Sequence, residues 1–182
     1  MACIQNITFD EIEKGRSTTF SRTLSQNNIS LFAAMSGDVN PAHMDEKFAK
    51  GDLFHNVIAH GMWGGALISA LLGTELPGPG TIYVEQTFRF LRPVYLADTV
   101  TVRITVAAKQ QAKHHVTLDC KVTNQNEIVV IEGSAEVIAP TTKICFERPA
   151  LPAVEIRTVE ASGPSNLRQR EDSQPLKSGG IT

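Results

Sequence analysis

Apolar and polar positions first follow a helical period over residues 26–36. Within this run Ile29 and Phe32 recur at the spacing that places side chains on one face of a helix. Ser25, just before the run, is a favourable N-cap, and Gly37, just after it, can adopt the left-handed conformation that ends a helix. The pattern therefore predicts a short helix between these two residues.

A second helical segment, residues 61–72, contains no charged residue and is apolar on every side. A helix of this kind is buried in a protein core, because it has no polar face to present to water. A bilayer requires about 20 apolar residues, so this segment is too short to cross one. We therefore expect a buried central helix.

Beyond residue 80 the period changes from helical to alternating. Alternation indicates strands with one buried face. Short turns join successive strands, which are then antiparallel, and the economical cover for the apolar face of this meander is the helix before it. The sequence thus predicts an α+β fold, a sheet wrapped around the helix, with strands in residues 82–90, 100–106, 116–122 and 128–138.

Composition narrows the classes of protein that remain. The 182 residues include 42% hydrophobic ones and carry a formal net charge of -2, an ordinary composition with no nucleic-acid or membrane footprint. Three scattered cysteines, Cys3, Cys120 and Cys145, predict no disulfide framework and suit a reducing compartment. Acidic residues stand near the N-terminus where a signal peptide would be basic and then apolar, so a cytoplasmic location is expected.

The character of the chain shifts near residue 140. Five of the nine prolines lie at residue 140 or beyond, with mixed charges and few regular apolar positions. We therefore predict one domain over residues 1–140 and a flexible, Pro-rich tail or linker over residues 141–182.

Residues 37–43 read Gly-Asp-Val-Asn-Pro-Ala-His and contain the candidate chemistry. Gly37 and Pro41 favour a non-helical path, on which the Asp38 carboxylate and the His43 imidazole can turn toward one point as an acid/base pair. Asn40 between them can hold either partner. A turn without catalytic function is the alternative, since the same residue types are common turn formers.

The wider context decides between these alternatives. The motif, and three further strings, resemble the MaoC-type dehydratases, and among them the R-specific enoyl-CoA hydratases most. The likeness covers roughly residues 10–139 and implies the hot-dog fold and a lyase activity. The further strings are Ala59-His-Gly-Met62, Gly80-Thr-Ile-Tyr83 and Phe90-Leu-Arg-Pro-Val-Tyr95.

The resemblance also implies a role for each site residue. Asp38 and His43 would be the catalytic dyad, Asn40 its support, Gly61 the backbone donor of the oxyanion hole and Ser69 a residue lining the site. Hydration of a trans-2-enoyl-CoA to the R-3-hydroxyacyl-CoA needs a base, an acid and a donor to the developing enolate oxygen. Which member of the dyad is base and which is acid stays open. No Cys/His spacing indicates a metal site, and no cofactor is implied because coenzyme A is part of the substrate.

Two alternative functions share this fold. One is another enzyme, a dehydratase of acyl carrier protein thioesters or a hot-dog thioesterase; the other is a non-catalytic acyl-binding module. His60, next to Gly61, could orient the site or serve only in packing. Unpaired sheet edges predict a homodimer or higher homo-oligomer. The start of the tail is similar to linkers that join such hydratases to a phosphate acyltransferase, so we also expect a fusion in a longer chain.

Overall fold

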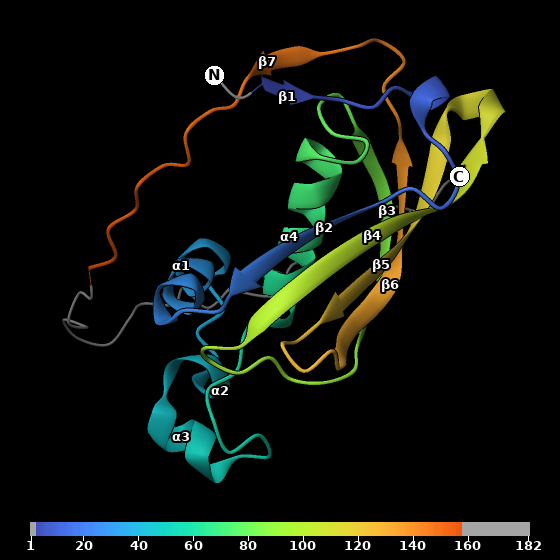
Figure 1. The fold of residues 1–182 in the computed structure, drawn as a ribbon. Coiled ribbons are helices and arrows are strands. Elements are labelled where there is room, and N and C mark those ends of the chain that lie inside the picture. The colour runs from blue at the N-terminus through green and yellow to red at the C-terminus, as the bar shows by residue number, and fades with distance from the viewer. Residues whose placement is uncertain (1–2, 158–182) are drawn as a thin grey trace, which may run out of the picture.

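The computed structural model describes residues 3–157 and shows a curved sheet packed against one apolar helix (Figure 1). The helices are α1 (Gln26–Ser36), α2 (Pro41–Met44), α3 (Glu46–Gly51) and α4 (Gly61–Thr74), with single 3-10 turns η1 (Phe9–Glu11) and η2 (Gln111–Lys113). The strands are β1 (Cys3–Gln5), β2 (Ser17–Thr23), β3 (Ile82–Phe90), β4 (Thr99–Gln110), β5 (His115–Thr123), β6 (Val129–Ile138) and β7 (Cys145–Glu147). Among the described helices, none is both long enough and apolar enough to span a membrane.

The main sheet has five antiparallel strands in the order β2-β4-β5-β6-β3. The predicted meander is confirmed for β4, β5 and β6. The place of β3 differs from the expectation, because β3 pairs with β6 and lies at the opposite end of the sheet from β2. Residues 91–98 carry the chain from β3 across to β4, so strands that follow each other in sequence here are not neighbours.

Helix α1 forms as predicted. The Ser25 hydroxyl accepts a hydrogen bond from the Asn28 N–H at 3.2 Å, and Gly37 ends the helix with a φ of 76°. A positive φ of this size is strained for residues with a Cβ, so the glycine determines where the helix stops.

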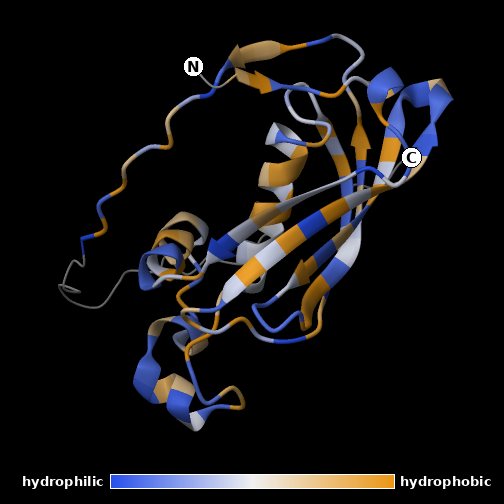
Figure 2. Cartoon of the chain, in the orientation of Figure 1, coloured by the Kyte–Doolittle hydropathy of each residue, from blue (hydrophilic) through white to orange (hydrophobic). Residues whose placement is uncertain are grey.

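The predicted central helix runs through the core but is not buried on every side. Trp63, Ile68 and Leu72 are buried against the sheet, and the buried positions of β4 and β5 are apolar as well. Hydrophobic and hydrophilic residues alternate along β4 in Figure 2. On the opposite side Met62 is 52% exposed, and Ala66, Ser69 and Ala70 are also exposed. The expectation of complete burial is wrong for the single chain, because one sheet covers only one side of a helix.

Strand β3 departs from its expected burial for a related reason. Its alternation predicted an apolar buried face, but Ile82 is 58% exposed and Val84 is 48% exposed. As an edge strand, β3 has a neighbour on one side only. It therefore presents apolar side chains and an unpaired backbone edge in the described part of the chain.

The start of the expected tail is attached to the N-terminus. Strand β7 pairs with β1, and a disulfide joins Cys3 to Cys145, so the expectation of no disulfide is wrong. The two cysteines are 142 residues apart, a separation at which sequence spacing carries no information on pairing. Residues 158–182 of the expected tail lie outside the described residues.

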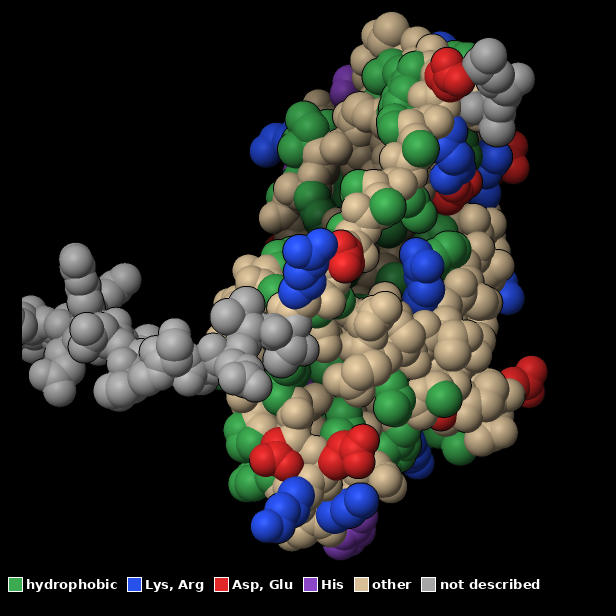
Figure 3. Space-filling model, turned by 90° about the vertical axis from the view of Figure 1, so that its left-hand side faces the viewer, with side chains coloured by type: hydrophobic (Ala, Val, Ile, Leu, Met, Phe, Trp, Pro, Cys, Tyr) green, Lys and Arg blue, Asp and Glu red, His purple; other side chains and the backbone are tan. Residues whose placement is uncertain are grey.

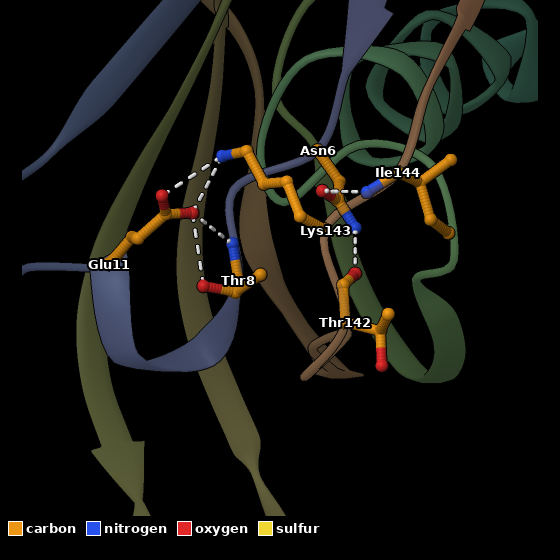
Figure 4. Close-up of polar contacts among 6 residues, drawn as sticks. All are labelled: Asn6, Thr8, Glu11, Thr142, Lys143 and Ile144. Atoms are coloured by element: carbon orange, nitrogen blue, oxygen red, sulfur yellow. Dashed lines mark hydrogen bonds and ion pairs between the residues drawn. The ribbon is translucent and has the colours of Figure 1, made fainter.

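Polar contacts strengthen this attachment (Figure 4). Asn6, only 1% exposed, donates to the Thr142 carbonyl at 2.8 Å and accepts from the Ile144 N–H at 2.9 Å. Lys143 pairs with Glu11 at 2.7 Å, and the hydrogen bond from Lys143, followed by those from Thr8, lowers the pKa of the Glu11 carboxyl to about 2. Residues 141–147 are therefore part of the folded unit and not a free tail.

We predict that Asn6→Ala destabilises the protein. The substitution removes two hydrogen bonds made by a buried side chain and leaves the Thr142 carbonyl and the Ile144 N–H without this partner, a loss of about 1–3 kcal/mol. The melting temperature should fall by about 2–4 °C for each kcal/mol in a chain of this size. Thermal unfolding followed by circular dichroism measures the effect.

The matched control is Lys143→Ala in the same segment. Its ion pair is half exposed and screened by water, so it should shift the melting temperature far less than Asn6→Ala. Equal shifts in the two variants would show that the Asn6 hydrogen bonds do not anchor the segment.

Candidate active site

The loop between α1 and α2 carries Asp38 and leads directly to His43. Asn40 is the N-cap of α2, where its Oδ1 accepts from the Ala42 N–H at 3.0 Å, and Pro41 is the first helical residue. The expectation that Pro41 keeps this segment out of helix is wrong beyond residue 40, because proline is well tolerated at a first helical position. His43 therefore lies on a capped helical turn, which holds it more firmly than a loop would.

The structure brings Asp38 and His43 together as expected. One carboxylate oxygen of Asp38, one ring nitrogen of His43 and one ring nitrogen of His60 all lie within 4.8 Å of one another. The Asp38 Oδ1 accepts from the Asn40 N–H at 3.2 Å, which orients the carboxylate. Asp38 is exposed and His43 is half-buried, so water can reach the space between them.

The hydrogen bond of His43 determines which ring nitrogen is free. Its Nδ1 lies 2.9 Å from the Ile58 carbonyl oxygen, which can only accept, so Nδ1 carries the hydrogen. Ile58 is itself held in place, because the next residue, Ala59, donates its N–H to the Val94 carbonyl at 2.8 Å. In the neutral ring Nε2 then has the lone pair, and His43 can take a proton from a neighbouring water.

Gly61 begins α4 beside this pair. The first N–H groups of a helix have no partner inside it, and the helix dipole adds partial positive charge at that end. A Cβ at Gly61 would lie 3.1 Å from the Phe90 Cε1, so a side chain there would crowd the ring. A side chain at this position would therefore narrow the pocket beside Phe90, next to the N–H that can donate to a developing negative charge.

A pocket of about 270 Å³ opens at the start of α4. His43 and Gly61 form part of its wall, and most of the rest is apolar, including Trp63, Phe90 and Ile131. An apolar pocket with a few converging polar groups is typical of a site for a small organic group.

Two other residues occupy places that the sequence left uncertain. Ser69 lies on the exposed stripe of α4, two helical turns beyond Gly61, and is not among the residues that line the pocket in the described part of the chain. Its role in the site stays a prediction. His60, by contrast, is 2% exposed and lines the pocket. It contacts both Asp38 and His43, although the sequence showed only that it stands next to Gly61.

Charged groups around the site are few. Arg92 lies at the pocket, whereas Arg89 is paired with Glu132 at 2.9 Å. On the face drawn in Figure 3, Lys and Arg side chains are scattered among Asp and Glu side chains instead of gathering in one area. Arg92 is thus the cation best placed to meet a negatively charged part of a ligand at the entrance.

Comparison with known proteins agrees with this geometry. The family model described as "MaoC like domain" matches residues 8–127. The chain belongs to the MaoC-like dehydratase family. Its sheet wrapped around α4 is the hot-dog fold, as the resemblance in the sequence implied.

Three similar proteins make the family relationship more specific. An (R)-specific enoyl-CoA hydratase of Rhodospirillum rubrum is 46% identical over 132 residues, which is 72% of this chain and 91% of the relative. A 3-hydroxybutyryl-CoA dehydratase of Methylorubrum extorquens is 39% identical over 132 residues, which is 72% of this chain and 83% of the relative. The solved structure of R-hydratase PhaJ1 from Pseudomonas aeruginosa superposes with a TM-score of 0.82 at 43% identity, over 86% of this chain and all of that one.

Proposed function

We propose that the protein catalyses the reversible, R-specific hydration of trans-2-enoyl-CoA to 3-hydroxyacyl-CoA. The observation that carries the proposal is that His43 and the start of α4 line one apolar pocket, with the Asp38 carboxylate within 4.8 Å of a ring nitrogen of His43. They supply an acid/base group, an oxyanion donor and a carboxylate that can hold the water and stabilise the imidazolium, and together these groups can hydrate an enoyl thioester. The similar hydratases and the dehydratase named above support the choice of a CoA thioester.

The reaction can be followed atom by atom. The enoyl group enters the apolar pocket with its thioester carbonyl oxygen toward the Gly61 N–H. The lone pair of His43 Nε2 takes a proton as the water oxygen bonds to C3, and the electrons of the C2–C3 double bond move onto the carbonyl oxygen as an enolate. The imidazolium then returns the proton to C2, and the carbonyl re-forms.

Asp38 supports both steps of this scheme. Its carboxylate holds the water by a hydrogen bond and stabilises the positive charge on His43 by proximity. Because the oxygen and the proton both come from the side on which the dyad lies, the addition is syn. Dehydration follows the same path in reverse.

The CoA moiety would extend away from the pocket past Arg92, whose guanidinium suits a phosphate. A thioester of acyl carrier protein shares the pantetheine arm and is the alternative substrate. Thioester hydrolysis on the same fold is a further alternative, because it would use the same oxyanion donor. Comparing both thioesters, and assaying free CoA release, separates these activities.

Two expectations from the sequence belong to this proposal. We place the enzyme in the cytoplasm, where thiols are kept reduced, so the hydrogen bonds of Asn6 would hold the β1–β7 segment when the Cys3–Cys145 bond is open. Fusion to a phosphate acyltransferase through residues 141–182 also stays a prediction.

We further propose a homodimer joined through β3. The edge of β3 is unpaired in the described chain and carries exposed apolar residues, and α4, which packs against Phe88 of this strand at Gly65, exposes Met62 and Ala66. An exposed apolar edge of this kind associates with another edge unless it is covered. A second copy would cover both features at once.

Replacement of the dyad tests the function. His43→Ala removes the group that exchanges the proton and should lower hydration of crotonyl-CoA by about 10²–10⁴-fold. Asp38→Asn removes the negative charge beside the imidazolium and should lower it by about 10²–10³-fold, the usual cost of losing one electrostatic stabiliser. Since both act on one water, the double variant should lose little beyond the slower single variant. Loss of the enoyl absorbance gives the rate, and chiral analysis of the product gives the R configuration.

Two controls accompany this test. Circular dichroism should show all variants folded, and a metal chelator should leave the wild-type rate unchanged because the scheme uses no metal. A folded Asp38→Asn protein with more than about a tenth of wild-type turnover would exclude the dyad mechanism.

Gly61→Val tests the oxyanion donor. The branched side chain would meet Phe90 and stand where the thioester carbonyl approaches, so turnover should fall by about 10²–10³-fold. A Cβ added at Gly73, near the other end of α4, would meet no atom within 4 Å, and Gly73→Ala therefore serves as the control. Turnover near that of the wild type in a folded Gly61→Val protein would remove Gly61 from the site.

The dimer can be tested at its proposed edge. Sedimentation should give twice the chain mass of 19.8 kDa for the wild type. Val84→Lys should produce the monomer, because it places a charge on the exposed apolar strand. Ser21→Lys, on the edge strand β2 at the other end of the sheet, should remain a dimer. A wild-type monomer at micromolar concentration contradicts the proposal.

A further inference from the structure

His60 is a buried histidine that the reaction scheme above does not use. It is 2% exposed and is the N-cap residue of α4, where its side chain makes no capping hydrogen bond. A buried polar side chain is costly unless it makes compensating hydrogen bonds. The contacts of the imidazole therefore indicate what it contributes.

One nitrogen of the ring binds the loop that carries the catalytic carboxylate. The His60 Nε2 lies 2.9 Å from the backbone carbonyl oxygen of Asp38, which can only accept, so Nε2 carries the hydrogen. This bond joins residues 22 positions apart. It connects the Asp38 loop to the residue directly before the oxyanion donor, Gly61.

The face of the ring contacts the histidine of the dyad. The ring centroids of His60 and His43 are 4.1 Å apart with an interplanar angle of 36°, and Phe32 of α1 lies 4.9 Å from His60. One imidazole thus touches α1, α2 and the loop between them. Its position limits how the His43 ring can tilt.

The other nitrogen shows that packing alone does not explain this residue. His60 Nδ1 is buried and has no hydrogen-bond partner among the described residues. Such an unpaired atom lowers stability. A phenyl ring would fill similar space without that cost, but it could not donate to the Asp38 carbonyl. What the imidazole adds over an apolar ring is this one donor.

We propose that His60 is a positioning residue that holds the Asp38 carboxylate, the His43 ring and the Gly61 N–H in one fixed arrangement. It acts through the Asp38 backbone and the His43 ring, and it exchanges no proton with the substrate. The inference rests on the proposed hydration at the same site. Loss of the donor should therefore slow turnover while leaving substrate binding almost unchanged.

His60→Phe and His60→Gln separate the donor from the ring. His60→Phe keeps an aromatic ring between Phe32 and His43 but removes the donor. We expect kcat on crotonyl-CoA to fall about tenfold to a hundredfold, since misplacement of a reacting group by about 1 Å can cost about 10²-fold, with little change in KM. His60→Gln places amide hydrogens within reach of the Asp38 carbonyl and should recover most of kcat.

Ile68→Val is the control for a change in stability alone. Ile68 is fully buried on the same helix, away from the pocket lining, and the lost methyl group should lower the melting temperature with kcat unchanged. Equal kcat losses in the Phe and Gln variants, or a rise in KM without loss of kcat, would overturn the positioning role. So would wild-type kcat in His60→Phe.

A measurement on the wild type keeps the proposal testable if the variants do not fold. Long-range ¹H–¹⁵N spectra should show neutral His60 with its hydrogen on Nε2 and neutral His43 with its hydrogen on Nδ1. A hydrogen on His60 Nδ1 would overturn the bond to Asp38. An inactive wild type would instead refute the proposed hydration, and the spectra would still decide the hydrogen bond.

Discussion

The close approach of α4 to β3 and β6 is the contact on which the rest of the structure depends. Gly64 lies directly against Ile131 of β6, and a Cβ at Gly65 would stand 2.9 Å from the Phe88 ring of β3. A side chain at either position would force the Ile131 or Phe88 side chain to move or the helix to shift away from the sheet, and overpacking of this kind typically costs about 1–3 kcal/mol. The two glycines let the helix lie close enough for its N-terminus to meet the pocket beside Phe90.

This contact also explains why the single chain exposes so much apolar surface. The backbone of α4 packs at Gly64 and Gly65 against side chains of the sheet. The other side of the helix therefore cannot turn inward to bury Met62 and Ala66. Strand β3, which presents Phe88 to the helix, is at the same time the last strand of the sheet. The packing that forms the site and the surface proposed for dimerisation are therefore consequences of one arrangement.

The parts of the fold that could be predicted are those whose burial depends on neighbours in sequence. The caps Ser25 and Gly37 defined α1, alternation of apolar and polar residues defined β4 and β5, and a run rich in β-branched residues indicated β6. The place of β3 could not be predicted, because alternation does not say which strand lies alongside. Strand β2 (Ser17–Thr23) was missed since its residues are mostly polar and exposed, and the β1–β7 pair depends on residues at opposite ends of the chain.

In the candidate site, too, the features set by neighbours in sequence could be predicted and those set by distant residues could not. The spacing of Asp38 and His43, with a glycine and a proline around them, was enough to predict that they converge. The start of α2 at Pro41 was missed because a proline was interpreted as a break in helix rather than as its first residue. The role of His60 could not be inferred from adjacency to Gly61, since it depends on a carbonyl 22 residues earlier and on two rings from other helices.

The hydrogen bonds that position the dyad share one property, which is that each ends on a backbone atom. His43 binds the Ile58 carbonyl, His60 the Asp38 carbonyl and Asn40 the Ala42 N–H. The geometry of the site therefore depends on the path of the chain and on three polar side chains, and not on the identity of Ile58 or Ala42. Met35 and Val39, close to the dyad in sequence, are exposed and make none of these hydrogen bonds. A substitution that changes the chain path, above all at Gly37 with its φ of 76°, should disturb the dyad more than loss of any of these exposed side chains.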